Sequence, residues 1–233
     1  MAWPGSSIDG AKLLTAIQAV VLSPRDAQAL VDGYRQEALA VDPNRDPRQV
    51  QELVATKVIE RFTWMTTTSG AVTALPGVVP GLGTGIAVGG AFGDAVVCMK
   101  LQVDMCLALC GAFNYDLEQE RTRHLAFLLA AGGTLEKHGV EGAHKMASED
   151  SVRLVRQYLE GAATEAVKQL FKRIGLTLTR KALQRILPFG IGVALGAGAN
   201  YAMTRYVGDK ATRWLLLDRD TPRTPSPEET AAT

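Results

Sequence analysis

The feature that most constrains this chain is a run of 32 residues without a charged side chain, between Arg61 and Asp94. On a helix, a glycine at every fourth position lies along one face, where a second backbone can approach closely. Because each glycine costs a helix about 1 kcal/mol relative to alanine, this face needs a helix partner or a contact buried in a bilayer. The glycines concerned are Gly77, Gly81, Gly85, Gly89 and Gly93.

This first uncharged segment is too short for a simple membrane span. Its proline-free part, Gly81–Gly93, would extend about 20 Å as a helix, against a hydrocarbon core of about 30 Å. A longer span would include Asp94, Lys100 and Asp104, and each charge costs on the order of 3 kcal/mol at the bilayer centre. Two alternatives stay open: a re-entrant hairpin hinged at Pro76–Gly81, and a buried helix in a water-soluble bundle.

A second uncharged segment covers residues 186–204 and is 19 residues long. It is nearly long enough to cross a membrane, but its many small residues make it only weakly hydrophobic. We expect the two segments to pack against each other or to enter a bilayer. Asp94 and Asn200 are then candidates for a buried polar contact between them, because a buried polar group is costly without a partner. The glycines of the second segment are Gly190, Gly192, Gly196 and Gly198.

The residues that lead into the second segment are strongly basic. From Ala166 to Gly208 there is no acidic residue, although the whole chain has a net charge of only +1. The same stretch has apolar residues at helical spacing, which predicts an amphipathic helix. A basic amphipathic helix is typical of a surface that faces anionic lipid, where each cation contributes ~1 kcal/mol. The candidate lipid-facing residues are Lys168, Lys172, Arg173, Arg180, Lys181 and Arg185.

Two other interpretations of the basic stretch stay open. The first is a solvated basic face that pairs with acidic residues elsewhere in the fold, namely Glu136, Glu141, Glu149, Asp150 or Glu160. The second is nucleic-acid binding, which is weaker because the stretch lacks interleaved aromatic residues and matches no nucleic-acid-binding motif. We therefore expect no nucleic-acid partner.

Hydrophobic periodicity is helical nearly throughout and no alternating strand pattern appears, so the sequence predicts an all-α multi-helix bundle. Ser23 and Pro24 predict the start of one helix, and Asp116 is the expected N-cap of another. The expected helices cover residues 8–22, 24–41, 47 into 69–75, 82–113, 116–138, 151–187 and 189–217. We expect residues 1–45 to be a helical extension, 46–217 a helical domain, and the proline-rich residues 218–233 a disordered tail.

Side chains with chemical potential are few in this sequence. Cys98, Cys106 and Cys110 lie in one apolar stretch without a disulfide pattern, which favours small buried thiols in a reducing compartment. Lys100 and Asp104 stand four residues apart on a helix and are expected to pair.

Motifs for catalysis or metal binding are missing from the sequence. His124, His138 and His144 do not have metal-ligand spacing, and neither a phosphate loop nor a nucleophile elbow occurs. We expect no cofactor and no metal, and the catalytic residues, if any, are unknown. Because the first residues lack the basic region of a signal peptide, we expect a cytoplasmic protein.

Two parts of the chain resemble the EcsC family. The C-terminal part, Leu187–Ala211, opens with Leu-Pro and continues with small residues, an Asn-Tyr pair and a Val-Gly pair. Upstream, an Ala-Leu-Pro-Gly sequence at 74–77, the lone Asp94 and the stretch Cys110–Leu117 resemble the family's central pattern. The turn reads Phe113-Asn-Tyr-Asp, which departs from the Tyr-Gly-Asp-like turn of the family.

The resemblance covers about residues 50–215. It implies a hydrophobic helical protein without an established enzymatic activity, and the family's name suggests a connection with membrane transport and secretion. It carries over no catalytic residue.

The favoured hypothesis is a non-catalytic, membrane-associated protein at the inner face of the membrane, peripheral or re-entrant. Its partner would be anionic membrane lipid or a hydrophobic small molecule, and a homo-oligomer stays open. The alternative is a soluble helical bundle that binds a lipid or another small hydrophobic ligand in an apolar cavity. A third hypothesis is an enzyme that uses Asp94 in such a cavity.

Overall fold

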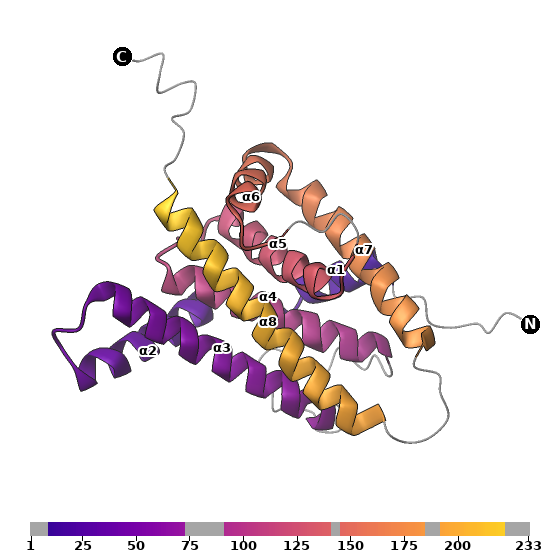
Figure 1. Cartoon of the computed structure of the whole chain (residues 1–233), viewed down its shortest axis with the longest axis horizontal. Coiled ribbons are helices and arrows are strands. Elements are labelled where there is room, and N and C mark those ends of the chain that lie inside the picture. The colour runs from indigo at the N-terminus through magenta and orange to yellow at the C-terminus, as the bar shows by residue number, and fades with distance from the viewer. Residues whose placement is uncertain (1–8, 73–90, 141–144, 185–191, 222–233) are drawn as a thin grey trace, which may run out of the picture.

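The computed structural model describes residues 9–72, 91–140, 145–184 and 192–221. These residues form eight α-helices and no strand, so the predicted all-α bundle is confirmed (Figure 1). The helices are α1 (Gly10–Gln18), α2 (Pro24–Val41), α3 (Pro47–Val72), α4 (Ala91–Ala112), α5 (Glu120–Lys137), α6 (Glu149–Gly161), α7 (Ala163–Gln184) and α8 (Gly192–Asp220).

The centre of the bundle is α4, which packs against α1, α2, α3, α5 and α8. Every side chain from Met99 to Phe113 is buried. Within the described part of the chain, Ala95–Ala112 is the one stretch that is long and apolar enough to cross a membrane, with a mean hydropathy of 1.6. Because 83% of that stretch is buried inside the bundle, its composition is that of a core helix surrounded by other helices.

Local sequence signals set the starts of α2 and α3. The hydroxyl of Ser23 accepts a hydrogen bond from the Asp26 amide at 3.1 Å, and Pro24 occupies the first turn of α2. The carboxylate of Asp46 accepts a hydrogen bond from the Arg48 amide at 2.8 Å, just before α3 begins at Pro47. Both predicted starts are confirmed, because side-chain caps satisfy amides that a helix leaves unpaired.

The predicted start of the next helix at Asp116 is wrong. The carboxylate of Asp116 accepts a hydrogen bond from the Glu118 amide at 3.0 Å, within the turn that precedes α5. The helix itself begins at Glu120, and Gln119 is its N-cap residue. An aspartate can stabilise either a turn or a helix start, and here the side chain of Asp116 bonds within the turn, to the Glu118 amide and the side chain of Gln119.

The predicted single helix 151–187 is also wrong, because the structure divides it into α6 and α7 at Ala162. Its start lies earlier than predicted, since Ser148 caps α6 and accepts a hydrogen bond from the Ser151 amide at 3.2 Å. The break follows Gly161 and lets the two helices diverge: α6 packs against α8, whereas α7 packs against α1 (Figure 1). The basic candidates from Lys168 to Lys181 consequently all belong to α7.

The last helix continues beyond its predicted end, through Asp218 to Asp220. Asp218 is buried and forms an ion pair with Arg156 of α6, with 2.7 Å between Oδ1 and Nε. The hydroxyl of Tyr115 donates a hydrogen bond to the same carboxylate. These contacts hold the end of α8 against the bundle, and the rest of the predicted tail, residues 222–233, lies outside the described residues.

Candidate functional site

The two uncharged segments are bordered by helix ends that lie at one end of the bundle. The first segment includes the end of α3 and the start of α4, and the second is bordered by the end of α7 and includes the start of α8. All four helix ends lie at the lower right of Figure 1, and α8 packs against both α3 and α4. We call the described helical parts, residues 62–72 of α3 and 192–204 of α8, the uncharged end.

Most of the glycines predicted to mediate packing or insertion are not open to structural test. Gly77, Gly81, Gly85, Gly89 and Gly190 lie outside the described residues, and the surroundings of Gly93, Gly192 and Gly196 within their helices are also outside. Whether the two segments pack against each other therefore stays a prediction.

Gly198 is the one predicted glycine whose surroundings are described. It is exposed, and a Cβ atom built on it would meet no neighbouring side chain or helix within 4 Å. Among the residues that the structure describes, Gly198 thus has no second helix packed against it. Asn200 is partly exposed and Asp94 lies in α4, but the side chain of Asp94 is outside the description, so their predicted contact is untested.

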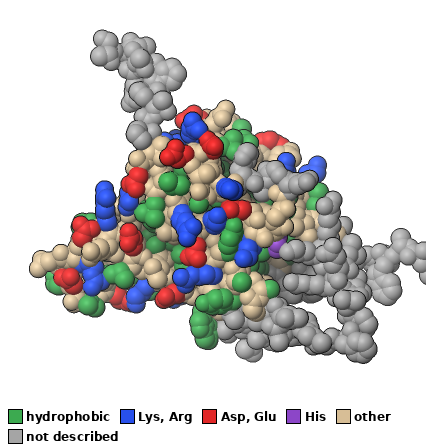
Figure 2. Space-filling view, viewed as in Figure 1, with side chains coloured by type: hydrophobic (Ala, Val, Ile, Leu, Met, Phe, Trp, Pro, Cys, Tyr) green, Lys and Arg blue, Asp and Glu red, His purple; other side chains and the backbone are tan. Residues whose placement is uncertain are grey.

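Large apolar side chains are exposed near this end of the bundle. Trp64 of α3 is 69% exposed, Tyr201 of α8 is 47% exposed, and Leu176 of α7 is 56% exposed. None of the five residues from Gly198 to Ala202 is buried. Figure 2 shows hydrophobic side chains gathered at the lower edge of the molecule, over the second half of α3, whereas charges of both signs are mixed over the rest of that face.

The basic side chains of α7 lie on its outer face. Lys168, Lys172 and Arg173 are exposed, while Phe171 and Ile174 between and beside them are buried against the bundle. These three cations form no ion pair with any residue that the structure describes. Arg180 and Lys181 belong to α7, but their side chains are outside the description, and Arg185 lies outside the described residues.

Two of the acidic residues considered as partners for the basic face pair elsewhere. Glu136 binds Lys210 of α8, with 2.7 Å between Oε1 and Nζ, and Asp150 pairs with Arg153 of its own helix. Burial alone would raise the pKa of Glu136, but hydrogen bonds from Lys210, the Met146 amide and Tyr206 together lower it below its ordinary value. The pairing interpretation of the basic face therefore finds no partner among the described acids.

Close glycine packing does occur in the fold, at positions that the sequence did not single out. A Cβ atom at Gly208 of α8 would lie 2.8 Å from Cγ1 of Ile59 of α3. At Gly10 of α1 it would lie 2.2 Å from the backbone oxygen of Phe171 of α7. Gly208 follows Gly196 and Thr204 at multiples of four residues, and this spacing of small residues is the signal that could have identified it.

Lys100 and Asp104 form the predicted ion pair, and both residues are 1% exposed. The other carboxylate oxygen of Asp104 accepts a hydrogen bond from the Leu22 amide at 2.8 Å. Burial raises the pKa of Asp104 above its ordinary value, and the charge of Lys100 opposes that shift. This pair fastens the connection between α1 and α2 to the core helix, so its role is structural.

The buried cysteines have the properties expected of core residues. Cys106 and Cys110 are fully buried, and burial raises the pKa of both thiols above the ordinary value. Because the thiolate is the nucleophile and metal ligand, protonated thiols enclosed in the core are inert. This agrees with the prediction of small buried thiols for these two residues, whereas Cys98 is partly exposed, and none of the three forms a disulfide bond.

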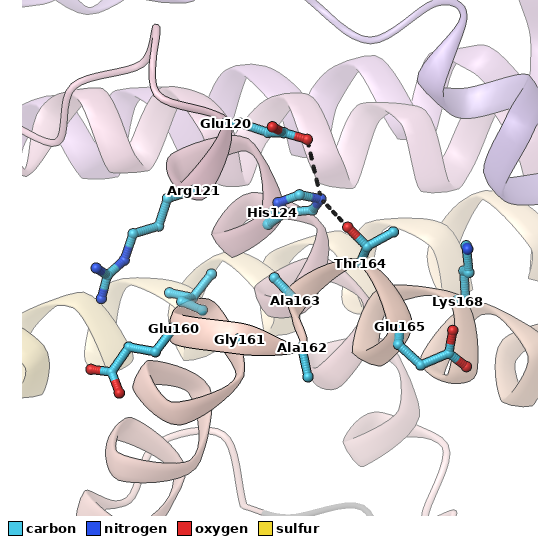
Figure 3. Close-up of a pocket in the computed structure, with 11 residues that line it drawn as sticks. Glu120, Arg121, His124, Glu160, Gly161, Ala162, Ala163, Thr164, Glu165 and Lys168 are labelled. Atoms are coloured by element: carbon cyan, nitrogen blue, oxygen red, sulfur yellow. Dashed lines mark hydrogen bonds and ion pairs between the residues drawn. The ribbon is translucent and has the colours of Figure 1, made fainter.

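A surface hollow of about 480 Å³ lies between the start of α5 and the junction of α6 and α7 (Figure 3). Its centre is His124, whose Nε2 lies 3.3 Å from the Thr164 hydroxyl and 3.9 Å from a carboxylate oxygen of Glu120. Arg121 and Glu160 line one side of the hollow, and Glu165 and Lys168 line the other.

The contacts of His124 do not form a catalytic relay. A base that activates a hydroxyl through one ring nitrogen is normally oriented by an acid at the opposite nitrogen, but Thr164 and Glu120 both approach Nε2. The described residues also contain no cluster of histidine, cysteine or acidic side chains that could hold a metal ion. The hollow therefore presents mixed charges without an arrangement for a particular reaction.

Comparison of the chain with protein-family models, with curated proteins and with solved structures yields no match. The resemblance to the EcsC family stays an expectation drawn from Leu187–Ala211 and the central pattern. What the chain does must accordingly be inferred from its own helices, their charges and their exposed surfaces.

Proposed function

We propose that this protein is a non-catalytic, membrane-associated helical bundle that directs its uncharged end toward a membrane containing anionic lipid. The observation that carries the proposal is the outer face of α7, where three exposed cations have no described acidic partner. That helix leads directly into the second uncharged segment. A basic surface beside an uncharged apolar surface matches the two layers of a membrane, namely charged headgroups and hydrocarbon.

The electrostatic part of this interaction comes from Lys168, Lys172 and Arg173. Each cation close to an anionic membrane surface contributes ~1 kcal/mol, so three cations give on the order of 3 kcal/mol. Salt weakens this attraction, because the Debye length falls from about 10 Å at 0.1 M to about 3 Å at 1 M. Electrostatic binding alone would therefore be reversible and sensitive to salt.

The apolar part comes from large side chains that are exposed at the surface of the fold. Leu176 follows Lys172 by four residues, so the two share one face of α7. Trp64 and Tyr201 add exposed aromatic surface on α3 and α8. Burying apolar surface gains about 25 cal/mol per Å², which would stabilise a bound state after electrostatic attraction has brought the protein to the membrane.

A ligand-binding bundle is the alternative function, and no specific observation favours it. A second hollow, of about 420 Å³, lies between α1 and α7 and shares His124, Thr164 and Lys168 with the first. Eight of the eleven residues that line it are polar or charged, although the atoms that they expose to the hollow are more apolar than polar.

Flotation with liposomes tests the proposed function. The purified protein is mixed with vesicles of zwitterionic lipid alone or with added anionic lipid, at low salt and at 0.5 M salt, and is then centrifuged through a density gradient. We expect the protein to float with anionic vesicles at low salt and to float less at high salt or with zwitterionic vesicles. A protein that stays at the bottom under every condition would show that the proposed function is wrong. Copurification of lipid with a protein that never floats would instead support the ligand-binding alternative.

A further inference from the structure

The close contact between Gly208 and Ile59 fixes how α3 and α8 are aligned. The two helices pack together and run in opposite directions (Figure 1). The uncharged end is therefore reached by moving to higher residue numbers from Ile59 on α3 and to lower residue numbers from Gly208 on α8. At a rise of about 1.5 Å per residue, positions on the two helices can be compared along the bundle.

On both helices, the last charged residue before the uncharged end lies at nearly the same position along the bundle. The last charge of α3 before the uncharged end is Arg61, two residues beyond Ile59, and the last on α8 is Arg205, three residues beyond Gly208. These positions lie about 3 Å and about 4.5 Å from the contact. The two arginines are 144 residues apart in sequence, so only the fold brings their levels together.

Each helix then carries an exposed aromatic residue about one turn farther on. Trp64 follows Arg61 by three residues, and Tyr201 precedes Arg205 by four. Their distances from the Gly208–Ile59 contact along the bundle are about 7.5 Å and about 10.5 Å. A band of two arginines followed by a band of two exposed aromatics therefore crosses the α3–α8 pair.

We propose that Trp64 and Tyr201 are interfacial anchors that hold the α3–α8 pair in one leaflet of the membrane, which rests on the proposed membrane association. Tryptophan and tyrosine are enriched at membrane interfaces, and arginine side chains extend from a helix toward phosphate groups. Beyond Arg61, residues 62–72 of α3 measure about 16 Å as a helix. That length matches one leaflet, which is half of a hydrocarbon core of about 30 Å, and is too short to cross the whole membrane.

The charge pattern favours lipid over a second copy of the chain as the occupant of this surface. The two arginines lie at nearly the same position along the bundle, and beyond them residues 62–72 of α3 and 192–204 of α8 carry no charge, as a phosphate layer above hydrocarbon requires for this helix pair. Arg61 is exposed, and Arg205 is half exposed beside Asp209 at 3.4 Å, so both side chains can reach headgroups. Self-association through the same surface is one of the outcomes that the test distinguishes.

The fluorescence of Trp64 on vesicles tests this inference. The chain has three tryptophans, and Trp214 is 1% exposed. A Trp3→Phe protein emits from Trp64 and Trp214, and a Trp3→Phe/Trp64→Phe protein emits from Trp214 alone. The difference between the two spectra is the emission of Trp64. Anionic vesicles carry phospholipids brominated either near the headgroup end or near the tip of the acyl chains.

We expect Trp64 emission to shift to shorter wavelength on vesicles and to be quenched most by the shallow bromines, while Trp214 emission is unchanged. If the protein floats with vesicles but neither bromine position quenches Trp64, the anchor inference is wrong and the proposed function stands. If the protein does not float, both are wrong. Emission that shifts with protein concentration in the absence of lipid would show that a second copy covers Trp64, and would also overturn the inference.

Charge substitutions give an independent test with matched controls. Trp64→Lys and Tyr201→Lys should each weaken partitioning into anionic vesicles about tenfold, equivalent to about 1.4 kcal/mol. Leu53→Lys and Tyr158→Lys are the controls, because each replaces an exposed apolar side chain away from the uncharged end. Equal partitioning of all four variants would overturn the assignment of anchors.

Discussion

Gly208 of α8 lies so close to Ile59 of α3 that a Cβ atom on the glycine would stand 2.8 Å from Cγ1 of the isoleucine. The sulfur of Met105 would be 3.1 Å away on the side of the core helix. Three helices thus meet around a residue without a side chain, and this contact sets the alignment that places Arg61 and Arg205 at one level.

Gly208→Ala should destabilise the protein by about 1–3 kcal/mol, because overpacking a filled contact forces neighbouring side chains or helices apart. Gly198→Ala is the matched control on the same helix. In the described part of the chain, no side chain or second helix lies near Gly198, so alanine there should stabilise the helix by up to about 1 kcal/mol. Urea unfolding followed by circular dichroism measures both changes, and equal effects of the two substitutions would contradict the observed packing.

Asp104→Ala should cost about 3–5 kcal/mol, because it leaves the buried Lys100 without its counter-ion. The amide of Leu22 also loses its acceptor. A Lys100→Met/Asp104→Leu double variant removes both charges and should recover most of that loss, since apolar replacements of a buried pair are often neutral or stabilising. Thermal unfolding of the two variants provides the comparison, and a single variant as stable as the double variant would argue against an enclosed ion pair.

Glu136→Gln should lower the free energy of unfolding by about 1–2 kcal/mol at pH 7, because the carboxylate accepts hydrogen bonds from a charged lysine and an amide. Its pKa is lowered by folding, so the stability it contributes is present above its unfolded pKa of about 4.3 and is lost as pH falls through the folded pKa. The difference between wild type and variant should therefore shrink below about pH 4. Denaturant unfolding at a series of pH values checks this, and a difference that does not change with pH would be inconsistent with it.

A Lys172→Glu/Arg173→Glu variant should lose most of its flotation with anionic vesicles at low salt, because two attractive charges become repulsive. Both side chains are exposed and form no described ion pair, so the fold should tolerate the change. Arg25→Glu/Arg48→Glu is the control, since it makes the same change in net charge at exposed positions of α2 and α3. If both variants float equally, net charge rather than the face of α7 governs binding.

Much of the fold could be predicted from the sequence wherever a signal is local. The pair Ser23-Pro24 defines the start of α2, and the four-residue spacing of Lys100 and Asp104 predicts their ion pair. The division of residues 149–184 into α6 and α7 could not be predicted, because a glycine such as Gly161 is compatible with a continuous helix. The break depends on where α8 and α1 lie, which are contacts distant in sequence.

The candidate site was predictable only in part for the same reason. The basic face of α7 follows from the spacing of Lys168 and Lys172 relative to the apolar residues of one helix. The common level of Arg61 and Arg205 depends on the alignment of α3 with α8, which no local pattern encodes. Trp64 lies in an apolar stretch of the sequence two residues after Phe62, and only its exposure in the fold distinguishes it from a core residue.

Fractionation of cells that make the protein at its natural level tests the central claim most directly. After lysis without detergent, the membrane and soluble pools are separated by centrifugation and the chain is detected in each. Membrane association predicts that most of the chain is found in the membrane pool and that Lys172→Glu/Arg173→Glu moves it toward the soluble pool. A wild-type chain found wholly in the soluble pool would contradict the proposal.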